Sequence, residues 1–386
     1  MRHSRLLAAV VAVFAAALLV TAGCAPESTP TTAPTTPTTP TTPTTPTAPS
    51  QPSETKVSWR MQMPFPAGYV MYEYGNYFAK AVTDMSGGRV TVTNNPGGSI
   101  VDAWTEMRAV HEGILDVSLI SAHYFTSEVG MTGCLFTLYP GGFNSQEFMT
   151  WYYEGGGAAL SQEMFARKGF KVVPMLGGCS SAEMFGWFAK PVKSMDDFKG
   201  LKFRTAGIWG SILNEAGAAV VSMPGGEVYE ALQRGVIDAF EYGTPGIDWA
   251  AGFQELGAYC TGPGIHAPSA QLDILVGTEE WAKLTPDLQA IVYNACKATY
   301  LTSWAYCDYQ DVLGMQKLKD YGTKFVILSE DVQRQVVTLS NQYYDKLATE
   351  DEFFAKVLKS QRDFFKAHRQ LKAFVEPNPA LMNYES

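Results

Sequence analysis

Two oppositely charged residues, Arg204 and Glu241, stand at the ends of two expected β-strands. Residues 201–248 alternate three times between a strand pattern and a helix pattern; the first strand ends at Arg204 and the third at Glu241. The carboxyl ends of parallel strands meet at one edge of an open α/β sheet, so we expect both side chains to face one cleft. A guanidinium suits a carboxylate, which it can grip through two parallel hydrogen bonds. The pair favours a site for a carboxylate ligand, with a structural salt bridge as the alternative.

Small and turn-forming residues follow both of these strand ends. Residues 205–207 (Thr-Ala-Gly) lead from Arg204 into a helix, whose amino end directs free N–H groups into the same space. Residues 243–245 (Gly-Thr-Pro) break the chain before another helix, and Asp248 in its first turn complements the helix dipole. The stretch therefore looks like the organising centre of the fold.

The composition restricts the class of protein. The 386 residues are 46% hydrophobic and 17% charged, which is enough for one large or two medium globular domains. A net charge of -9 argues against a nucleic-acid partner. Apart from Cys24, the cysteines are odd in number and form no CxxC motif, so they indicate buried thiols rather than disulfides or a structural zinc site.

The amino terminus has the pattern of an export signal. Arg2 and Arg5 precede the apolar residues 6–20, and small residues then lead to Cys24. The Ala-Gly-Cys sequence resembles the lipobox of bacterial lipoproteins, which predicts a signal peptide over residues 1–23 and a lipid on Cys24. Cleavage without lipid attachment is the alternative.

Residues 24–55 are dominated by threonine and proline and cannot form a core, so we expect a semi-rigid linker. A tether after a lipidated cysteine would hold a folded domain at the outer face of the cell membrane. This arrangement favours an extracytoplasmic receptor that serves a membrane partner over a free secreted enzyme. Beyond the linker, no run of eighteen apolar residues predicts a further membrane span.

The folded part, residues 56–386, begins as an alternation of strands and helices, which predicts parallel α/β sheets. The expected strands are 57–63, 89–93, 115–121 and 171–176, and the expected helices are 74–85, 102–112 and 145–167. Together with residues 201–248, this pattern predicts two α/β lobes around a central cleft. We assign about 56–178 and 270–310 to the first lobe and about 179–269 to the second.

Long helices follow Thr278, with helical patterns over residues 288–319 and 331–374. These helices exceed what two small sheets need for cover. The surplus predicts either a helix that braces both lobes or a contact between two copies of the chain.

The motifs of the second half resemble those of a known receptor family. Residues 203–207 read FRTAG, residues 223–239 read MPGGEVYEALQRGVIDA, residues 241–242 read EY, and residues 263–266 read PGIH. Together they are similar to the extracytoplasmic solute receptors of tripartite ATP-independent periplasmic (TRAP) transporters, above all to the 2-oxo acid and hydroxy acid receptors. The likeness extends from Val57 to about Lys372.

The resemblance implies a bilobal binding protein, not an enzyme. It would close on a small monocarboxylate such as pyruvate or lactate and deliver it to membrane subunits of a transporter. Similar 2-oxo acid receptors pair through their carboxyl-terminal helices, so a homodimer is also implied.

The same resemblance assigns roles to individual residues. Arg204 would hold the substrate carboxylate, and a metal ion would bridge protein and substrate. Its ligands would be Glu241, the backbone oxygen of Tyr242, and Glu183, where the family commonly has glutamine. Arg204 balances only one of the three negative charges that Glu241, Glu183 and a bound acid bring together. We therefore expect a divalent ion, calcium rather than sodium.

Three aromatic residues are weaker candidates. Tyr124 follows an expected strand and could reach the ligand from the first lobe, and Trp187 could line the pocket beside Phe188; packing is the alternative for all three. The predicted substrate contacts are thus Arg204, Glu183, Tyr124, Trp187 and Tyr242. His266 lies in the PGIH motif, but its neighbours differ from the family pattern, and no ligand role is assigned to it.

Catalysis is the competing interpretation. The chain contains no GxSxG, HExxH, Walker or GxGxxG motif. Glu183 and Glu241 could nevertheless act as paired carboxylates in a lipid-anchored hydrolase or lyase. A third possibility is an anchored sensor that passes its ligand signal to a kinase.

Overall fold

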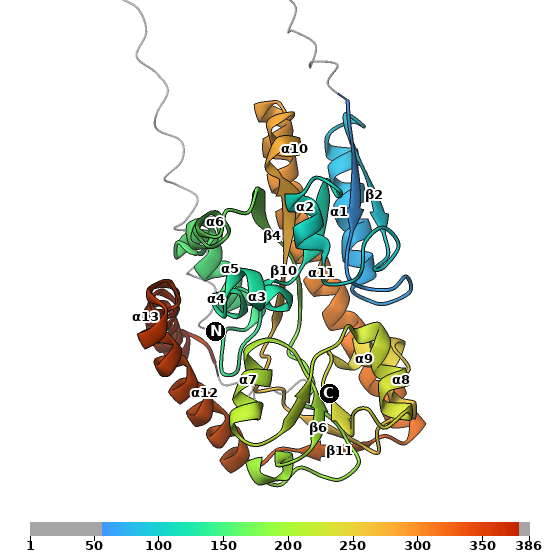
Figure 1. The fold of residues 1–386 in the computed structure, drawn as a ribbon, viewed down its shortest axis with the longest axis vertical. Coiled ribbons are helices and arrows are strands. Elements are labelled where there is room, and N and C mark those ends of the chain that lie inside the picture. The colour runs from blue at the N-terminus through green and yellow to red at the C-terminus, as the bar shows by residue number, and fades with distance from the viewer. Residues whose placement is uncertain (1–55, 378–386) are drawn as a thin grey trace, which may run out of the picture. The chain divides into compact units, whose positions relative to one another are not determined.

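The structure is a computed structural model and describes residues 56–377, which form two mixed β-sheets flanked by helices (Figure 1). The predicted signal peptide, Cys24 and linker lie outside the described residues.

The first sheet has the strand order β2-β1-β3-β10-β4. Its strands are β1 (Val57–Gln62), β2 (Val90–Asn95), β3 (Val117–Ile120), β4 (Val172–Ser180) and β10 (Ala270–Gly277). β1 runs parallel to β2 and β3, but β10 lies antiparallel between β3 and β4. The prediction of a purely parallel sheet is therefore wrong. The chain leaves the first sheet after β4 and returns to it in β10, so β10 runs in the direction opposite to β4.

The second sheet has the order β11-β9-β5-β8-β6-β7. Its strands are β5 (Gly186–Phe188), β6 (Lys202–Arg204), β7 (Ala219–Val221), β8 (Ala239–Phe240), β9 (Tyr259–Gly262) and β11 (Lys324–Ile327). β5 is antiparallel to both β8 and β9, so this sheet is mixed as well. β11 follows the long carboxyl-terminal helix in the sequence and pairs with β9. The sequence patterns did not predict this strand.

The alternation expected over residues 201–248 is confirmed. β6, β7 and β8 alternate with α7 (Gly207–Glu215), α8 (Val228–Gln233) and α9 (Pro245–Ala250). β6 pairs in parallel with β8, with Arg204 opposite Phe240, the residue before Glu241. Parallel pairing in this register puts the two predicted site residues at one sheet edge.

Two predicted helices are shorter or interrupted. The first sheet is covered by α1 (Tyr72–Met85), α2 (Glu106–His111), α5 (Ser145–Glu154) and α6 (Gly157–Arg167). The helix predicted over 145–167 breaks at Gly156, whose φ of 87° suits only glycine. The helix predicted from residue 102 begins only at Glu106.

Several short helices connect the longer elements: η1 (Ala122–Phe125), α3 (Thr126–Val129), α4 (Thr132–Leu135), η2 (Met195–Phe198), η3 (Gly225–Glu227), η4 (Phe253–Glu255) and α10 (Thr278–Ala282).

The 36-residue helix α11 (Pro286–Tyr321) braces both lobes, as one of the two predictions proposed. It begins with proline at its first position, ends at left-handed Gly322, and packs on β4 and α1 as well as on α9. The single helix predicted over 331–374 is two helices, α12 (Glu330–Glu350) and α13 (Glu352–Val375). Asp351 separates them because its carboxylate accepts the first N–H groups of α13.

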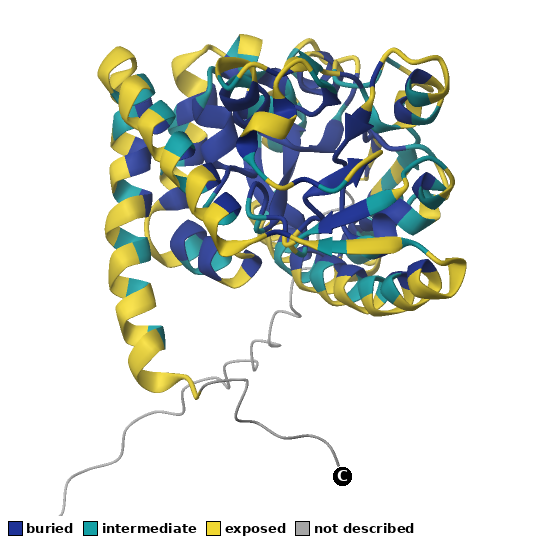
Figure 2. Ribbon diagram, turned by 90° about the horizontal axis from the view of Figure 1, so that it is seen from below, coloured by how far each residue is buried: buried dark blue, intermediate teal, exposed yellow. Residues whose placement is uncertain are grey.

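The buried residues lie along the sheets and the helix faces that cover them, while the outer faces of the helices are exposed (Figure 2). The five described cysteines are buried free thiols, as predicted. Within residues 56–377, no helix has both the length and the apolar character needed to cross a membrane.

Asp273 in the middle of β10 is a buried carboxyl group, and burial raises its pKa to about 8. In the unfolded chain the pKa is about 4, so between these values the folded state holds a proton that the unfolded state lacks. The free energy of unfolding should therefore fall as pH rises through this window, by at most about 1.4 kcal/mol per pH unit. We expect Asp273→Asn to remove this loss.

Urea unfolding at pH 5 and pH 8 measures the effect. The stability of Asp273→Asn relative to the wild type should rise by about 2 to 4 kcal/mol between the two pH values. Parallel pH profiles for the two proteins would contradict the assignment of Asp273 as a protonated core residue.

Candidate functional site

Arg204 and Glu241, the two residues predicted to share a site, lie in contact. Arg204 is 3% exposed, and its Nη1 donates to the backbone oxygen of Glu241 (2.7 Å) and to Oε1 of the same residue (3.3 Å). Its Nε and Nη2 donate to the backbone oxygen of Met223 (3.2 and 3.0 Å). These contacts can engage four of the five guanidinium N–H groups. The positive charge is thereby fixed in place, and one Nη2 N–H makes no hydrogen bond to the residues that the structure describes.

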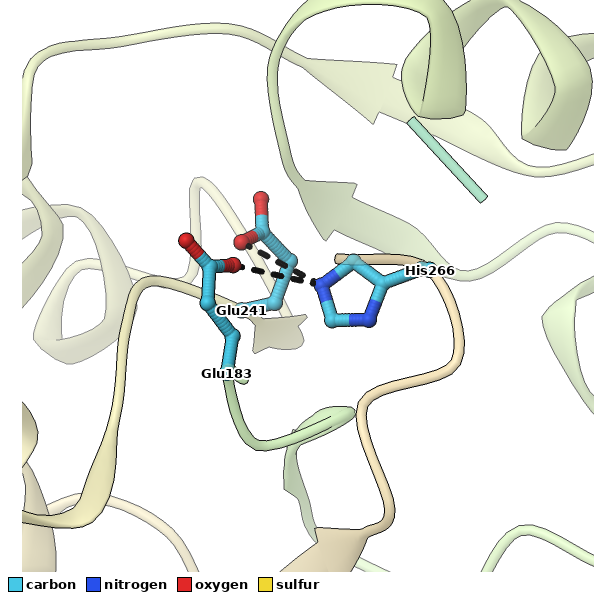
Figure 3. Close-up of side chains that lie close together, drawn as sticks. All are labelled: Glu183, Glu241 and His266. Carbon is cyan, nitrogen blue, oxygen red and sulfur yellow. Dashed lines mark ion pairs between the residues drawn. The ribbon is translucent and has the colours of Figure 1, made fainter. Parts of the chain in front are cut away.

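Three ionisable side chains gather beside Arg204, namely Glu183, Glu241 and His266 (Figure 3). The Nε2 atom of His266 is 3.4 Å from Oε2 of Glu183 and 3.7 Å from Oε2 of Glu241. Glu183 precedes β5, Glu241 follows β8, and His266 lies in the loop between β9 and β10. Segments far apart in the sequence thus converge on one buried point.

Backbone contacts lock the Glu183 and His266 segments together. The N–H of Glu183 donates to the backbone oxygen of Ala267 (3.1 Å). A Cβ at Gly264 would lie only 1.9 Å from the backbone oxygen of Glu183, so only glycine permits this close approach. The Pro-Gly pair of the PGIH motif therefore brings the histidine against the two carboxylates.

The charges of the cluster are strongly coupled. Burial raises the pKa of Glu183 to about 7. Burial would also raise the pKa of Glu241, but His266 and Arg204 outweigh it and lower that pKa to about 2. For His266, burial lowers the pKa, yet the two carboxylates overcome it and raise the pKa to about 9. Glu241 is thus firmly ionised, and the cluster favours a positive charge at its centre.

The donor atoms fit a metal ion. One atom from each of the three side chains lies within 4.8 Å of the others. Their contacts are ion pairs without hydrogen-bond alignment, and within the described residues Glu183 Oε2 and both His266 nitrogens have no hydrogen-bond partner. Buried unsatisfied polar atoms are costly, and a cation coordinated by the carboxylates would satisfy Glu183 Oε2. Carboxylate oxygens suit calcium, whereas an imidazole nitrogen is a ligand that transition metals prefer.

Sequence reasoning did not assign His266 to this site. The available signal was its position after the Pro-Gly pair that follows β9, opposite the segment that carries Glu183. Spacing along the chain could not show that His266 lies close to Glu183. The contact depends on the packing of two loops, one before β5 and one between β9 and β10, that each connect the two lobes.

Tyr242, predicted to offer its backbone oxygen to a metal, is buried next to Arg204. The guanidinium carbon lies 5.4 Å from the centre of the Tyr242 ring, a cation–π contact. A Cβ at Gly225 would lie 2.0 Å from the same ring, so the glycine makes room for the tyrosine. The side chain of Tyr242 therefore packs against the guanidinium and helps to hold it in place.

Tyr124 approaches from the first lobe, in η1. Its ring stacks on Trp104 with centroids 4.6 Å apart, and burial raises the pKa of its hydroxyl well above the ordinary value, with a smaller opposing effect from the charge of Arg204. Its neighbour His123 lies against α7 of the second lobe, because a Cβ at Gly207 would be 3.2 Å from His123 Cβ. The two lobes thus meet at the cluster, with Tyr124 on the first-lobe side.

Trp187 and Phe188, on β5, belong to packed aromatic layers. The indole N–H of Trp187 donates to Oδ2 of Asp248 (2.7 Å), and its ring stacks on Phe240. Phe188 stacks on Phe203 within the core. The structure brings Arg204, Glu183, Glu241 and Tyr242 together, with Tyr124 beside them, whereas the polar atom of Trp187 is already engaged by Asp248.

A family model described as bacterial extracellular solute-binding protein, family 7, matches residues 61–351. The chain belongs to this family. The resemblance to TRAP solute receptors is confirmed, and so is the bilobal α/β fold, which solved members of the group share. Family 7 consists of extracellular solute-binding proteins, and a receptor rather than an enzyme is the class that this membership supports.

A curated relative in Nostoc sp. (strain PCC 7120) is named monocarboxylate 2-oxoacid-binding periplasmic protein. It is 32% identical over 312 residues, which cover 80% of this chain and 84% of the relative.

Two solved structures of TRAP periplasmic solute binding proteins have the same fold. The protein from Colwellia psychrerythraea, with bound calcium and pyruvate, has a TM-score of 0.79 and 27% identity and covers 83% of this chain and 98% of its own. The protein from Pseudoalteromonas atlantica, with bound sodium and pyruvate, has a TM-score of 0.79 and 26% identity. The match covers 83% of this chain and 97% of the Pseudoalteromonas chain.

Proposed function

We propose that this family 7 protein is the receptor of a TRAP transporter for a small 2-oxo or 2-hydroxy monocarboxylate such as pyruvate or lactate. The acid binds together with a metal ion and is delivered to the membrane subunits of the transporter. The observation that carries this proposal is the buried cluster of Glu183, Glu241 and His266 beside Arg204. The 2-oxo acid relative and the pyruvate-bound structures support the same ligand class.

The balance of charge favours calcium over sodium. Glu183, Glu241 and the carboxylate of the ligand bring three negative charges, and Arg204 brings one positive charge. A divalent cation completes the balance once His266 releases the proton that its pKa of about 9 gives it in the metal-free cluster, whereas a monovalent ion then leaves one negative charge buried. When bound, the ion supplies the attraction that draws the oxygens of the acid towards the carboxylates.

Different residues of the chain bind different parts of the ligand and the ion. Arg204 offers its remaining Nη2 N–H and its fixed charge to the carboxylate of the ligand. Glu183, Glu241 and the backbone oxygen of Tyr242 hold the ion, and Tyr124 closes the site from the first lobe. Contacts from both lobes stabilise the closed state, which is the state that a membrane partner can distinguish from the open one.

The site of action is the outer side of the cell membrane. We include in the proposal the signal peptide over residues 1–23, the lipid on Cys24 and the linker over residues 24–55, which together would hold the receptor at the membrane. Pairing of two copies through the carboxyl-terminal helices is part of the same proposal.

Native mass spectrometry of the protein as purified tests the function. The expected result is a mass increase equal to one small monocarboxylate and one calcium ion per chain, and the same spectrum gives the number of chains. A protein that retains neither, and that gains no thermal stability from 2-oxo or 2-hydroxy acids with calcium, would refute the receptor proposal. Recovery of a changed acid after incubation would instead favour the hydrolase or lyase alternative, and capture of a kinase would favour a sensor.

Substitution of Glu183 by glutamine tests the choice of cation. The variant removes one negative charge at nearly unchanged size, so calcium affinity should fall by about tenfold or more, about 1.4 kcal/mol, and sodium should become the relatively better ion. Calorimetry with each ion in the presence of pyruvate measures the change. The control is Glu147→Gln, which removes a buried carboxylate paired with Arg369 outside the cluster. Equal calcium affinity in Glu183→Gln and the wild type would exclude Glu183 as a ligand.

A further inference from the structure

Trp104, just before α2, has a backbone φ of 71° and is the one non-glycine residue with positive φ within residues 56–377. This region is unfavourable for a bulky side chain because its Cβ crowds the backbone. Residues held in such conformations persist where their surroundings fix them, and they concentrate at ligand sites. The strain at Trp104 therefore needs an explanation in the surrounding structure.

Gln62 at the end of β1 fixes the loop that carries Trp104. The fully buried Gln62 side chain donates from Nε2 to the backbone oxygen of Val101 (2.8 Å) and to Oε1 of Glu106 (3.0 Å). Its Oε1 accepts from the N–H groups of Ile100 (2.7 Å) and Val101 (3.1 Å). Four hydrogen bonds from the Gln62 side chain thus hold the segments on both sides of Trp104.

The indole of Trp104 lies against Tyr124. The two rings are stacked, with centroids 4.6 Å apart and planes inclined by 16°. Tyr124 is held on another side by His123, whose ring centre lies 4.0 Å away. His123 in turn packs against Gly207, three residues after Arg204, where a Cβ would lie 3.2 Å from His123 Cβ, so the Tyr124 ring stands in the segment that faces the Arg204 side of the second lobe.

We propose that Trp104 is a positioning residue that fixes Tyr124 as a rigid first-lobe wall of the acid site, and that this wall limits the length of the ligand side chain. The inference rests on the proposed function and adds the basis of its substrate choice. The carboxylate end of every ligand meets the same Arg204 and metal cluster, so discrimination among acids falls to the part that faces Tyr124. A wall that cannot move admits the methyl group of pyruvate and rejects a branched chain.

The substitution Trp104→Gly distinguishes the effect of losing the indole ring from the effect of changing the backbone. Glycine adopts positive φ without strain, so the loop keeps its shape while the support of Tyr124 is lost. Trp104→Phe is the matched control, because it keeps an aromatic ring for the stack. Calorimetry with calcium compares pyruvate with 4-methyl-2-oxopentanoate, two acids that share the carboxylate and keto groups.

In Trp104→Gly, the preference for pyruvate over the branched acid should fall by about tenfold or more, the scale on which pocket size separates ligands that differ by methylene groups. The Trp104→Phe variant should keep the wild-type preference. An unchanged preference in Trp104→Gly, or an equal loss of affinity for both acids, would overturn the inference. If the wild type binds neither acid, the proposed function itself fails, which is a distinguishable outcome.

Discussion

Replacement of Arg204 by alanine is expected to weaken binding of the acid by about 2 to 5 kcal/mol. The ligand carboxylate would then be buried beside Glu183 and Glu241 without the fixed positive charge that now stands 3.3 Å from Glu241 Oε1. Arg204→Lys should also weaken binding substantially, because an ammonium cannot reproduce the planar contacts to Met223 and Glu241. Calorimetry with pyruvate and calcium measures both losses.

Two controls separate binding from folding. Circular dichroism and thermal unfolding show whether each Arg204 variant keeps its fold, which is necessary because the substitution leaves the backbone oxygen of Met223 without its partner. Arg369→Ala removes an arginine that pairs with Glu147 outside the site and should leave affinity unaltered. Folded Arg204 variants with wild-type affinity would remove this residue from the site.

Glu241→Gln is the second substitution with a large expected effect. The pKa of Glu241 lies well below neutrality, at about 2, so the wild-type group is ionised throughout the physiological range. Its loss takes away the one carboxylate within residues 56–377 that contacts both Arg204 and His266. We expect calcium affinity to fall by about 3 to 5 kcal/mol, as when one partner of a buried ion pair is removed, and acid binding to fall with it.

Calcium titration of the metal-free variant, with and without pyruvate, measures this loss. If the acid still binds Glu241→Gln with wild-type affinity while calcium does not, the ion and the acid bind independently and the bridging role is refuted. Glu147→Gln again serves as the matched buried carboxylate, and it should bind both normally.

The sequence predicted best what depends on local pattern. Arg204 and Glu241 could be brought together before the structure was known because each ends a strand in an alternating segment, and parallel strands share one edge. The brace of α11 across both lobes was one of the two arrangements predicted from a helical pattern too long for either sheet alone; the other was a contact between two copies of the chain. These features depend on period and length, which are readable along the chain.

What the sequence could not predict depends on contacts between distant segments. β5 and β10 run against their neighbours because the chain crosses between lobes there, and no local pattern records that crossing. The role of His266 depends on Gly264 touching the backbone of Glu183, and the position of Tyr124 depends on a strained Trp104 held by Gln62. Each is a consequence of tertiary packing that overrides local preference.

The central claim is that a buried cation and Arg204 together hold the acid, and calorimetry on metal-free protein tests it most directly. Pyruvate alone should give no measurable heat of binding, calcium should restore tight binding, and sodium should restore it only weakly. Tight pyruvate binding without added metal, or with sodium alone, would contradict the account.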